Sequence, residues 1–169
     1  VAANKVYDGT VTAQLAGVPV FQALAGDQVG VAPTLTASFE DKNAGTGKTV
    51  TLQGLALTGA DAGNYQPVAV GALTADISPR AATVSGLQAV GKVYDGSDAA
   101  TLTGSPVLSI LAGDQVSLAA APTARFDNKQ VGTGKAVTVS GLAFTGVDAA
   151  NYSFTLTGSF SADITPLTL

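Results

Sequence analysis

The sequence predicts an all-β protein built from two tandem domains, each an antiparallel β-sandwich. Three observations support this fold class. Thr and Val, which favour strands, are abundant, and 20 glycines supply turns. Short stretches of alternating apolar and polar residues are separated by frequent turn signals, a pattern typical of sandwiches. No segment shows sustained helical periodicity, so we expect strands rather than helices throughout.

The chain contains an internal repeat. The segment Lys-Val-Tyr-Asp-Gly occurs at residues 5–9 and again at residues 92–96, an offset of 92 − 5 = 87 residues. Further motifs return at the same offset without insertion or deletion. A repeat of this length is long enough to be a small domain with its own core, so we expect domains at about residues 1–79 and 80–166.

The repeat also predicts what happens at its edges. Residues 167–169 follow the second copy as residues 80–82 follow the first, so we expect them to open a further repeat. By the same logic the first copy has lost its own leading strand, unless residues 1–4 substitute for part of it. The chain therefore resembles a piece of a longer array.

The first half of each copy begins with a strand and a turn. Residues 6–7 are expected to end a strand, and Asp8–Gly9 to form a turn, because Gly accepts positive φ and Asp bonds back to nearby backbone. Residues 11–24 suit one or two short strands. Strand-like alternation then runs through residues 29–39, with Pro33 interrupting it.

The second half contains the clearest strand, at residues 48–53. The apolar phase slips across Gly54, and it slips again across Gly141 in the second copy. A glycine at a phase slip predicts a β-bulge. A last alternating strand ends before Pro79, and a short strand at residues 82–84 is expected after it.

The Asp-x-Gly-x-Tyr spacing of residues 61–65 resembles a corner of immunoglobulin-like sandwiches, in which a Tyr hydroxyl ties the corner to upstream backbone. The second copy has Ala150 in place of the Gly. The predicted sandwich is therefore immunoglobulin-like, with a small β-grasp-like fold as the alternative.

Composition restricts the chemistry that is available. Hydrophobic residues make up 46% of the chain, but many of them are Ala and Val, and charged residues make up only 12%. The absence of Cys excludes disulfides, and the absence of His removes the commonest general base and metal ligand. The net charge of −4 argues against nucleic acid as a partner. No apolar run reaches membrane-spanning length, so we expect no membrane insertion.

The segment Gly-Thr-Gly-Lys at residues 45–48 invites comparison with a phosphate-binding loop. That loop needs a glycine where this chain has Lys42, and a helix after the Lys. The residues after Lys48 are strand-like instead, and the second copy has Ala136 in place of the magnesium-binding hydroxyl. We therefore interpret the segment as a tight turn that enters a strand.

Acidic residues are few and scattered, and they form no Asp-x-Asp-x-Asp run. A calcium ion between adjacent domains, held by Asp8 or Asp61, is one alternative to solvated turn aspartates. Neither copy shows a spacing that indicates a cofactor site, and a triad with histidine cannot be built. We therefore expect no catalytic, cofactor-binding or metal-binding residues.

Lysines and tyrosines at the start of each copy offer two further hypotheses. Lys5 and Lys92 could form an internal amide with Asn64 or Asp76, or could be solvated lysines at a strand edge. Tyr7 and its repeat Tyr94 are the candidate ligand contacts, for a glycan or a protein. The competing interpretation is a half-buried strand tyrosine with a bonded hydroxyl.

Taken together, the motifs resemble the YDG domains of large bacterial surface and secreted proteins, which occur in tandem within filamentous-haemagglutinin-like adhesins. The match covers essentially the whole chain, twice, with departures at Ser97, Asn128 and Ala150. The motifs that carry it are Lys-Val-Tyr-Asp-Gly, Ala-Gly-Asp-Gln-Val, Phe-x-x-Lys-x-x-Gly-Thr-Gly-Lys, Asp-Ala-x-Asn-Tyr and Ala-Asp-Ile-Ser/Thr-Pro.

The resemblance implies a non-enzymatic module at the bacterial cell surface or outside the cell, with a role in adhesion and biofilms. We expect a structural stalk or spacer that extends or supports a binding region, with neighbouring repeats of the same chain as partners. The alternative is a binding module that recognises a carbohydrate or a surface protein, such as a glycan or a host or matrix surface. An enzyme is the third and weakest hypothesis.

Overall fold

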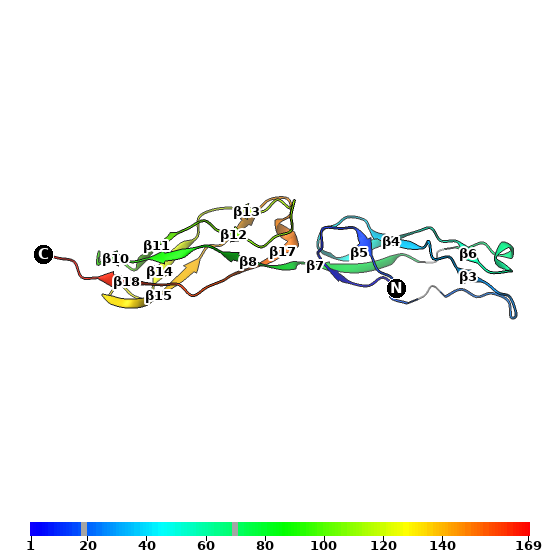
Figure 1. Ribbon diagram of the computed structural model, residues 1–169, viewed down its shortest axis with the longest axis horizontal. Coiled ribbons are helices and arrows are strands. Elements are labelled where there is room, and N and C mark those ends of the chain that lie inside the picture. The colour runs from blue at the N-terminus through cyan, green and yellow to red at the C-terminus, as the bar shows by residue number, and fades with distance from the viewer. Residues whose placement is uncertain (18–19, 69–70) are drawn as a thin grey trace. The chain divides into compact units, whose positions relative to one another are not determined.

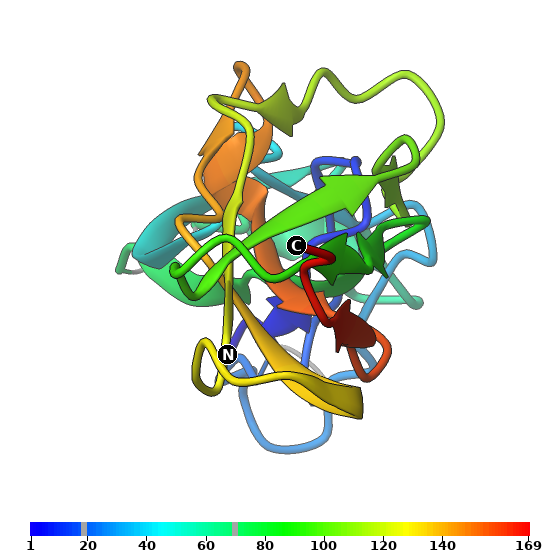
Figure 2. The same cartoon turned by 90° about the vertical axis from the view of Figure 1, so that its left-hand side faces the viewer.

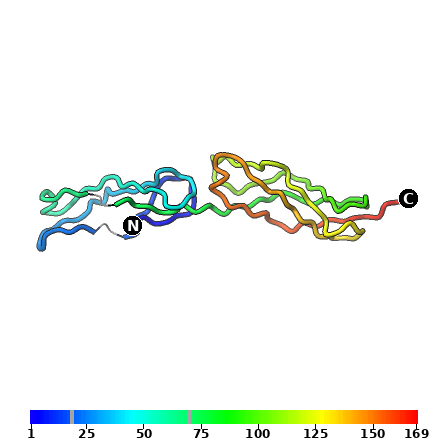
Figure 3. The backbone as a smooth tube through the Cα atoms, turned by 180° about the vertical axis from the view of Figure 1, so that it is seen from behind, coloured from blue at the N-terminus to red at the C-terminus, as the bar shows by residue number. Residues whose placement is uncertain are grey.

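The computed structural model describes residues 1–17, 20–68 and 71–169; the remaining positions are drawn grey in Figure 3. The protein is all-β, and its described residues contain no helix longer than a single 3-10 turn. None of these helices could cross a membrane. The chain divides into unit 1, Val1–Arg80, and unit 2, Ala81–Leu169. The boundary predicted between residues 79 and 80 lies one residue earlier.

Unit 1 is organised around a five-stranded sheet (Figure 1). A small two-stranded sheet and a 3-10 turn complete its described elements. The main sheet has the order β1 (Lys5–Val6), β7 (Leu73–Ser78), β5 (Gly45–Gln53), β4 (Thr36–Phe39) and β2 (Thr12–Ala13); the small sheet pairs β3 (Gly30–Val31) with β6 (Leu57–Thr58), and the turn is η1 (Ala62–Asn64).

Unit 2 repeats this plan with a six-stranded main sheet, and its C-terminal end, in red, faces the viewer in Figure 2. The main sheet has the order β10 (Lys92–Val93), β18 (Ser161–Thr165), β15 (Gly132–Ser140), β14 (Thr123–Phe126), β11 (Ala99–Thr103) and β9 (Gln88–Val90). The small sheet pairs β13 (Ser117–Leu118) with β16 (Phe144–Thr145), next to the turn η2 (Ala149–Asn151).

Unit 2 also has a third sheet, in which β8 (Arg80–Ser85) lies between β12 (Val107–Leu108) and β17 (Tyr152–Leu156). The strand predicted at residues 82–84 is therefore confirmed. In the described part of unit 1 the equivalent segments are not strands. The 87-residue offset places the counterpart of β8 ahead of Val1.

Residues 1–4 do not replace this leading strand. Ala2 forms an isolated bridge with Leu15, and the same offset places Ala89 of β9 opposite Leu102 in unit 2. The N-terminal residues of unit 1 thus take the position of β9 rather than that of β8. The leading strand of the first copy therefore has no substitute among the described residues.

The first strand of each unit pairs with the last strand, and this pairing is parallel. Lys5 lies opposite Ile77 in unit 1, and Lys92 lies opposite Ile164 in unit 2. The prediction of purely antiparallel sheets is wrong at this position. The two strands are separated by most of the unit, so no hairpin fixes their relative direction.

The core of each unit comes from the inward faces of its strands. In β4, Ala37 and Phe39 are buried while Thr36 is exposed, as period-two alternation requires. The hydrophobic core cluster of unit 2 consists of Ala124, Phe126, Val137 and Ile164. Because many core residues are only Ala or Val, we expect a unit of this size to have modest stability.

The bulge predicted at Gly54 is wrong, because β5 ends at Gln53 and Gly54 has a φ of 71° at the exit from the strand. A Cβ at this glycine would lie 2.5 Å from the carbonyl oxygen of Thr34. The register shift lies instead at the start of the strand, between Gly45 and Lys48. A strand end with positive φ produces the same phase slip as a bulge.

Candidate functional site

The Lys-Val-Tyr-Asp-Gly segment closes a turn through its lysine. The Lys5 ammonium lies 2.8 Å from Asp8 Oδ1 and donates to the carbonyl oxygens of Thr10 and Thr12 at 2.7 and 3.0 Å. Asp8 Oδ1 in turn accepts the Thr10 N–H at 2.9 Å. Gly9 has a φ of 79°, which confirms the predicted turn and explains why a glycine occupies this position.

The same turn in unit 2 uses Lys92, Asp95 and Ser97. Lys92 Nζ lies 2.8 Å from Asp95 Oδ1, which also accepts the N–H and hydroxyl of Ser97. These hydrogen bonds, that from Lys92 first, lower the pKa of Asp95 to about 2. In unit 1, burial raises the pKa of Asp8, but the hydrogen bonds from Lys5 and Thr10 outweigh burial and lower it.

The lysine therefore has partners other than those predicted for an internal amide. Lys5 contacts Asp8, whereas the carboxylate of Asp76 accepts the Gly47 N–H at 2.7 Å. The second candidate calcium ligand, Asp61, accepts the N–H of Gln28 at 2.9 Å. Among the described residues, no group of three acidic, His or Cys side chains is placed to hold a metal ion.

The two candidate ligand-contact tyrosines differ in exposure. Tyr7 is fully buried, and the Lys42 ammonium lies 5.7 Å from the centre of its ring. Tyr94 is half-buried and packs against the core of unit 2. Only Tyr94 therefore offers part of its ring for a ligand contact.

The Gly-Thr-Gly-Lys segment forms the bulged beginning of β5 rather than a phosphate-binding loop. Its amide at Gly47 is occupied by the Asp76 carboxylate, and its lysine is turned inward. Lys48, only 8% exposed, pairs with Asp41 at 2.9 Å and Glu40 at 3.5 Å. The hydrogen bond that Lys48 donates to Asp41 lowers the pKa of Asp41 and raises the pKa of Lys48. The segment thus joins strands of its own unit.

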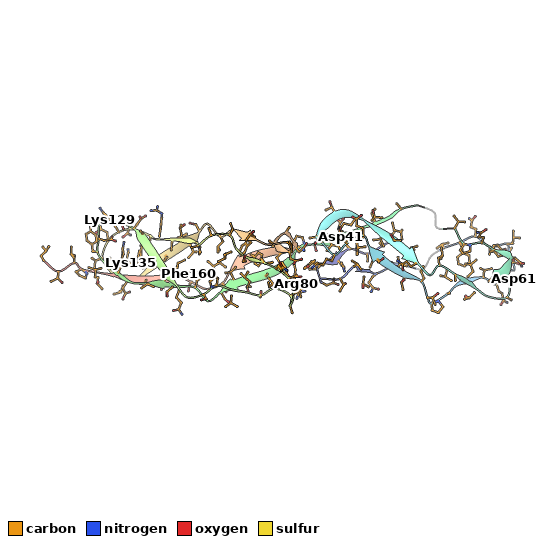
Figure 4. All side chains as sticks on the ribbon, turned by 90° about the horizontal axis from the view of Figure 1, so that it is seen from above. Asp41, Asp61, Arg80, Lys129, Lys135 and Phe160 are labelled. Carbon is orange, nitrogen blue, oxygen red and sulfur yellow. The ribbon has the colours of Figure 1, made fainter. Side chains whose placement is uncertain are left out.

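Unit 2 forms the equivalent pair between Lys135 and Asp127 at 2.8 Å. Lys135 also donates to Asn128 Oδ1 at 2.8 Å, so the departure from aspartate at this position keeps an oxygen acceptor. Lys129 and Lys135 lie near the same end of unit 2 (Figure 4). The substitution of Asn for Asp between the copies therefore leaves the lysine anchored.

The tyrosine at the end of the Asp-Ala-x-Asn-Tyr motif links two distant loops. Tyr65 Oη donates to Asp27 at 2.6 Å and accepts the Leu24 N–H at 2.9 Å. Asp27 belongs to the Ala-Gly-Asp-Gln-Val motif, so the two motifs bind each other. The predicted tie to upstream backbone is confirmed, although it reaches a loop about 40 residues earlier rather than the corner itself. Asp61 and Asp41 lie at opposite ends of unit 1 (Figure 4).

Each of these motifs holds another part of the same unit, which explains why all of them occur together at fixed spacing. The sequence profile of the YDG domain matches residues 1–71 and 78–159. The chain belongs to the YDG domain family. No curated protein and no solved structure matches it.

The second YDG unit repeats the link between loops with Tyr152, Asp114 and Leu111. Its corner is better covered than that of unit 1. Tyr152 and Asn151 are 7% and 2% exposed, whereas Tyr65 is half-buried and Asn64 is exposed. The same motif therefore has a different environment in the two YDG units.

The described residues of unit 1 also line an apolar groove of about 710 Å³. Its lining includes Val1, Val20, Phe21, Leu57, Pro67 and Leu73. Val20 is 94% exposed and Phe21 is 40% exposed, so the groove opens to solvent. Sequence reasoning did not predict this groove. The signal that points to it is the repeat, in which the first copy holds no counterpart of residues 80–87.

Proposed function

We propose that this chain is a non-enzymatic structural stalk or spacer of a bacterial extracellular adhesin, and that it extends or supports a binding region. One observation carries the proposal: β7 ends at Ser78, Pro79 comes next, and β8 begins at Arg80. A single residue therefore joins strands of successive YDG units. Proline restricts φ at this connection, which favours a stiff junction.

The chemistry of the motifs supports the same proposal. Lys5, Lys48 and Tyr65 all bind acceptors of their own unit. They reinforce turns and loops instead of converging on one shared cavity. Side chains that stabilise their own unit in this way suit a structural spacer between other domains.

We further infer that each unit is an immunoglobulin-like sandwich. The short strands, the separate small sheet and the tyrosine that secures a loop support this inference. Within the adhesin, the partners would be neighbouring YDG repeats of the same chain, and the module would lie at the bacterial surface or outside the cell.

The alternative function is a binding module for a carbohydrate or a surface protein. The groove of unit 1 favours the protein ligand, because its lining is mostly apolar and a glycan needs many polar partners. A glycan array and a panel of matrix proteins distinguish the two functions. Selective binding to either would replace the spacer proposal. Its loss in Phe21→Ala would place the ligand at the groove of unit 1, and its loss in Tyr94→Ala would place the ligand at the candidate tyrosine of unit 2.

The spacer function itself is tested at the junction. We expect a narrow distribution of distances between spin labels placed one in each unit, and a broader distribution after Pro79→Gly. The control is Pro33→Gly, because Pro33 lies in an exposed loop of unit 1. A distribution as broad as that of a flexible Gly-Ser linker of equal length, before any substitution, would contradict the proposal.

A further inference from the structure

The groove of unit 1 lies where β8 lies in unit 2. In unit 2, β8 is the central strand of its sheet, with β12 on one side and β17 on the other. At the 87-residue offset, the two sides of the groove match these two strands. The matched residues are Val20 with Val107, Phe21 with Leu108, and Pro67 with Phe154.

Unit 2 shows how this position is filled. Val84 of β8 lies opposite Leu108, and its carbonyl oxygen accepts the N–H and the hydroxyl of Thr157 at 2.9 and 3.0 Å. The Thr83 N–H donates to Ser109 Oγ at 2.7 Å. Val84 is 0% exposed. The strand thus supplies hydrogen bonds to both neighbours and a buried apolar face to the unit.

Unit 1 shows what the same position looks like without the strand. Residues 20–24 belong to no strand, although their counterparts begin with β12. Phe21, which lines the groove, is 40% exposed, whereas its counterpart Leu108 beside β8 is less exposed. An apolar channel between two segments that are not in strands is a geometry that can accept an added β-strand.

We propose that the groove of unit 1 is an acceptor site for a β-strand of the kind of β8, joined to the chain directly ahead of Val1. The position of Val1 favours this source. Val1 lines the groove and is the counterpart of Gln88, which comes shortly after the end of β8 at Ser85. A strand attached there is held beside its site, whereas a strand from another chain must first lose its translational freedom.

The acceptor defines the chemistry of its strand. The inward positions of β8 hold Ala82 and Val84, and the alternate residues Ala81 and Thr83 are exposed. The strand must therefore carry small or β-branched apolar residues at every second position. Proline is excluded at the position of Thr83, because the N–H there is a donor.

The test extends the full chain by eight residues, placing a second copy of the sequence of residues 80–87 directly ahead of Val1. We expect the melting temperature of unit 1 to rise by about 5 °C or more. We also expect hydrogen exchange at the amides of residues 20–22, 66 and 68 to slow at least about tenfold. The melting transition of unit 2, which already contains β8, is the internal reference.

The matched control is the same extension with aspartate at the position of Val84. It should leave both measurements at the values of the unextended chain, because a carboxylate cannot occupy the apolar groove without a partner. Equal stabilisation by both extensions, or no effect of either, would overturn the proposal. Binding of the eight-residue peptide in trans, with no effect of the attached copy, would overturn the cis source. The inference rests on the groove and on unit 2, and it does not depend on the spacer function.

Discussion

Unit 1 and unit 2 have the same motifs and nearly the same main sheet, but in the described residues only unit 2 has the sheet around β8. The difference distinguishes features that both units share from features that are found only with β8. Turns and loop links form in both units, since Lys5 and Lys92 each pair at 2.8 Å with the aspartate three residues later. Burial of the Asp-Ala-x-Asn-Tyr corner differs, because Asn151 is 2% exposed and Asn64 is exposed. The motifs therefore suffice for the main sheet, its turns and the links between loops. A buried Asp-Ala-x-Asn-Tyr corner is found in the unit that contains β8.

The largest effect should come from placing a charge in β8. We expect Val84→Asp to destabilise unit 2 by at least about 3 kcal/mol, because the residue is fully buried. Val84→Ala should cost about 1–3 kcal/mol. Urea unfolding followed by hydrogen exchange resolves the two units.

The control for this substitution is Val93→Asp, since Val93 is 52% exposed. Protection of the main sheet of unit 1 should stay unchanged in every variant. An equal loss of protection in both units would show that β8 does not distinguish them.

The next largest loss of stability should come from substituting a loop glycine, and it should be equal in the two units. Gly59 and Gly146 have φ values of 115° and 119°, and a Cβ on either would lie 2.1 Å from a backbone carbonyl oxygen. We expect Gly59→Ala and Gly146→Ala each to cost about 2–4 kcal/mol of unfolding free energy, measured by urea titration.

A neutral comparison is available at Gly63, which has open space around its Cβ position and corresponds to Ala150 in unit 2. Gly63→Ala should change stability by less than about 0.5 kcal/mol. A clear difference between the losses of unfolding free energy at Gly59 and Gly146 would mean that these two loops are not equivalent in the two units.

A smaller, unequal effect is expected at the corner asparagines. Asn151→Ala should destabilise unit 2 by about 1–3 kcal/mol, because the buried side chain loses its hydrogen bonds. Asn64→Ala should change unit 1 by less than about 0.5 kcal/mol. Both values come from thermal unfolding of the single variants. If the extension ahead of Val1 seats in the groove, the cost at Asn64 should rise toward that at Asn151.

The smallest effect concerns pH. The folded-state pKa of Asp95, about 2, lies below its ordinary value of 3.8. The turn therefore stabilises unit 2 above about pH 4, and this contribution is lost as the pH falls toward 2. Asp95→Asn should remove that pH dependence, as followed by thermal unfolding and by NMR titration of the carboxyl groups.

Unit 1 should show a shallower dependence in the same range. The pKa of Asp8 is also lowered, but burial opposes the hydrogen bonds from Lys5 and Thr10. Asp8→Asn is the matched variant. A steeper acid loss in unit 1 than in unit 2 would contradict this account of the two turns.

Local features of the fold could be predicted from the sequence because they depend on neighbouring residues. The turn at Asp8–Gly9 and the strand at residues 82–84 are indicated by short patterns, and both are present. The parallel pairing of β1 with β7 could not be predicted, since it joins residues more than 70 positions apart. The prediction of a bulge at Gly54 is wrong because a phase slip does not distinguish a bulge from a strand end.

The contacts of the candidate site were harder to predict, because they also join residues that are distant in the sequence. The sequence places Gly47 and Lys48 next to each other but does not show that Asp76 and Asp41 bind them. The repeat shows that the first copy, as given, holds no counterpart of residues 80–87. Its consequence, an open groove beside Phe21, depends on side chains brought together only by the fold.

Because the first and last strands of a unit pair in parallel, the main sheet can close only after the last strand has been synthesised. Lys5 meets Ile77, and Lys92 meets Ile164, so closure waits until the final strand of the unit has been made. Long-range pairing of this kind slows folding, because the loop entropy is lost before the contacts form. A nascent unit therefore stays open through almost all of its own synthesis.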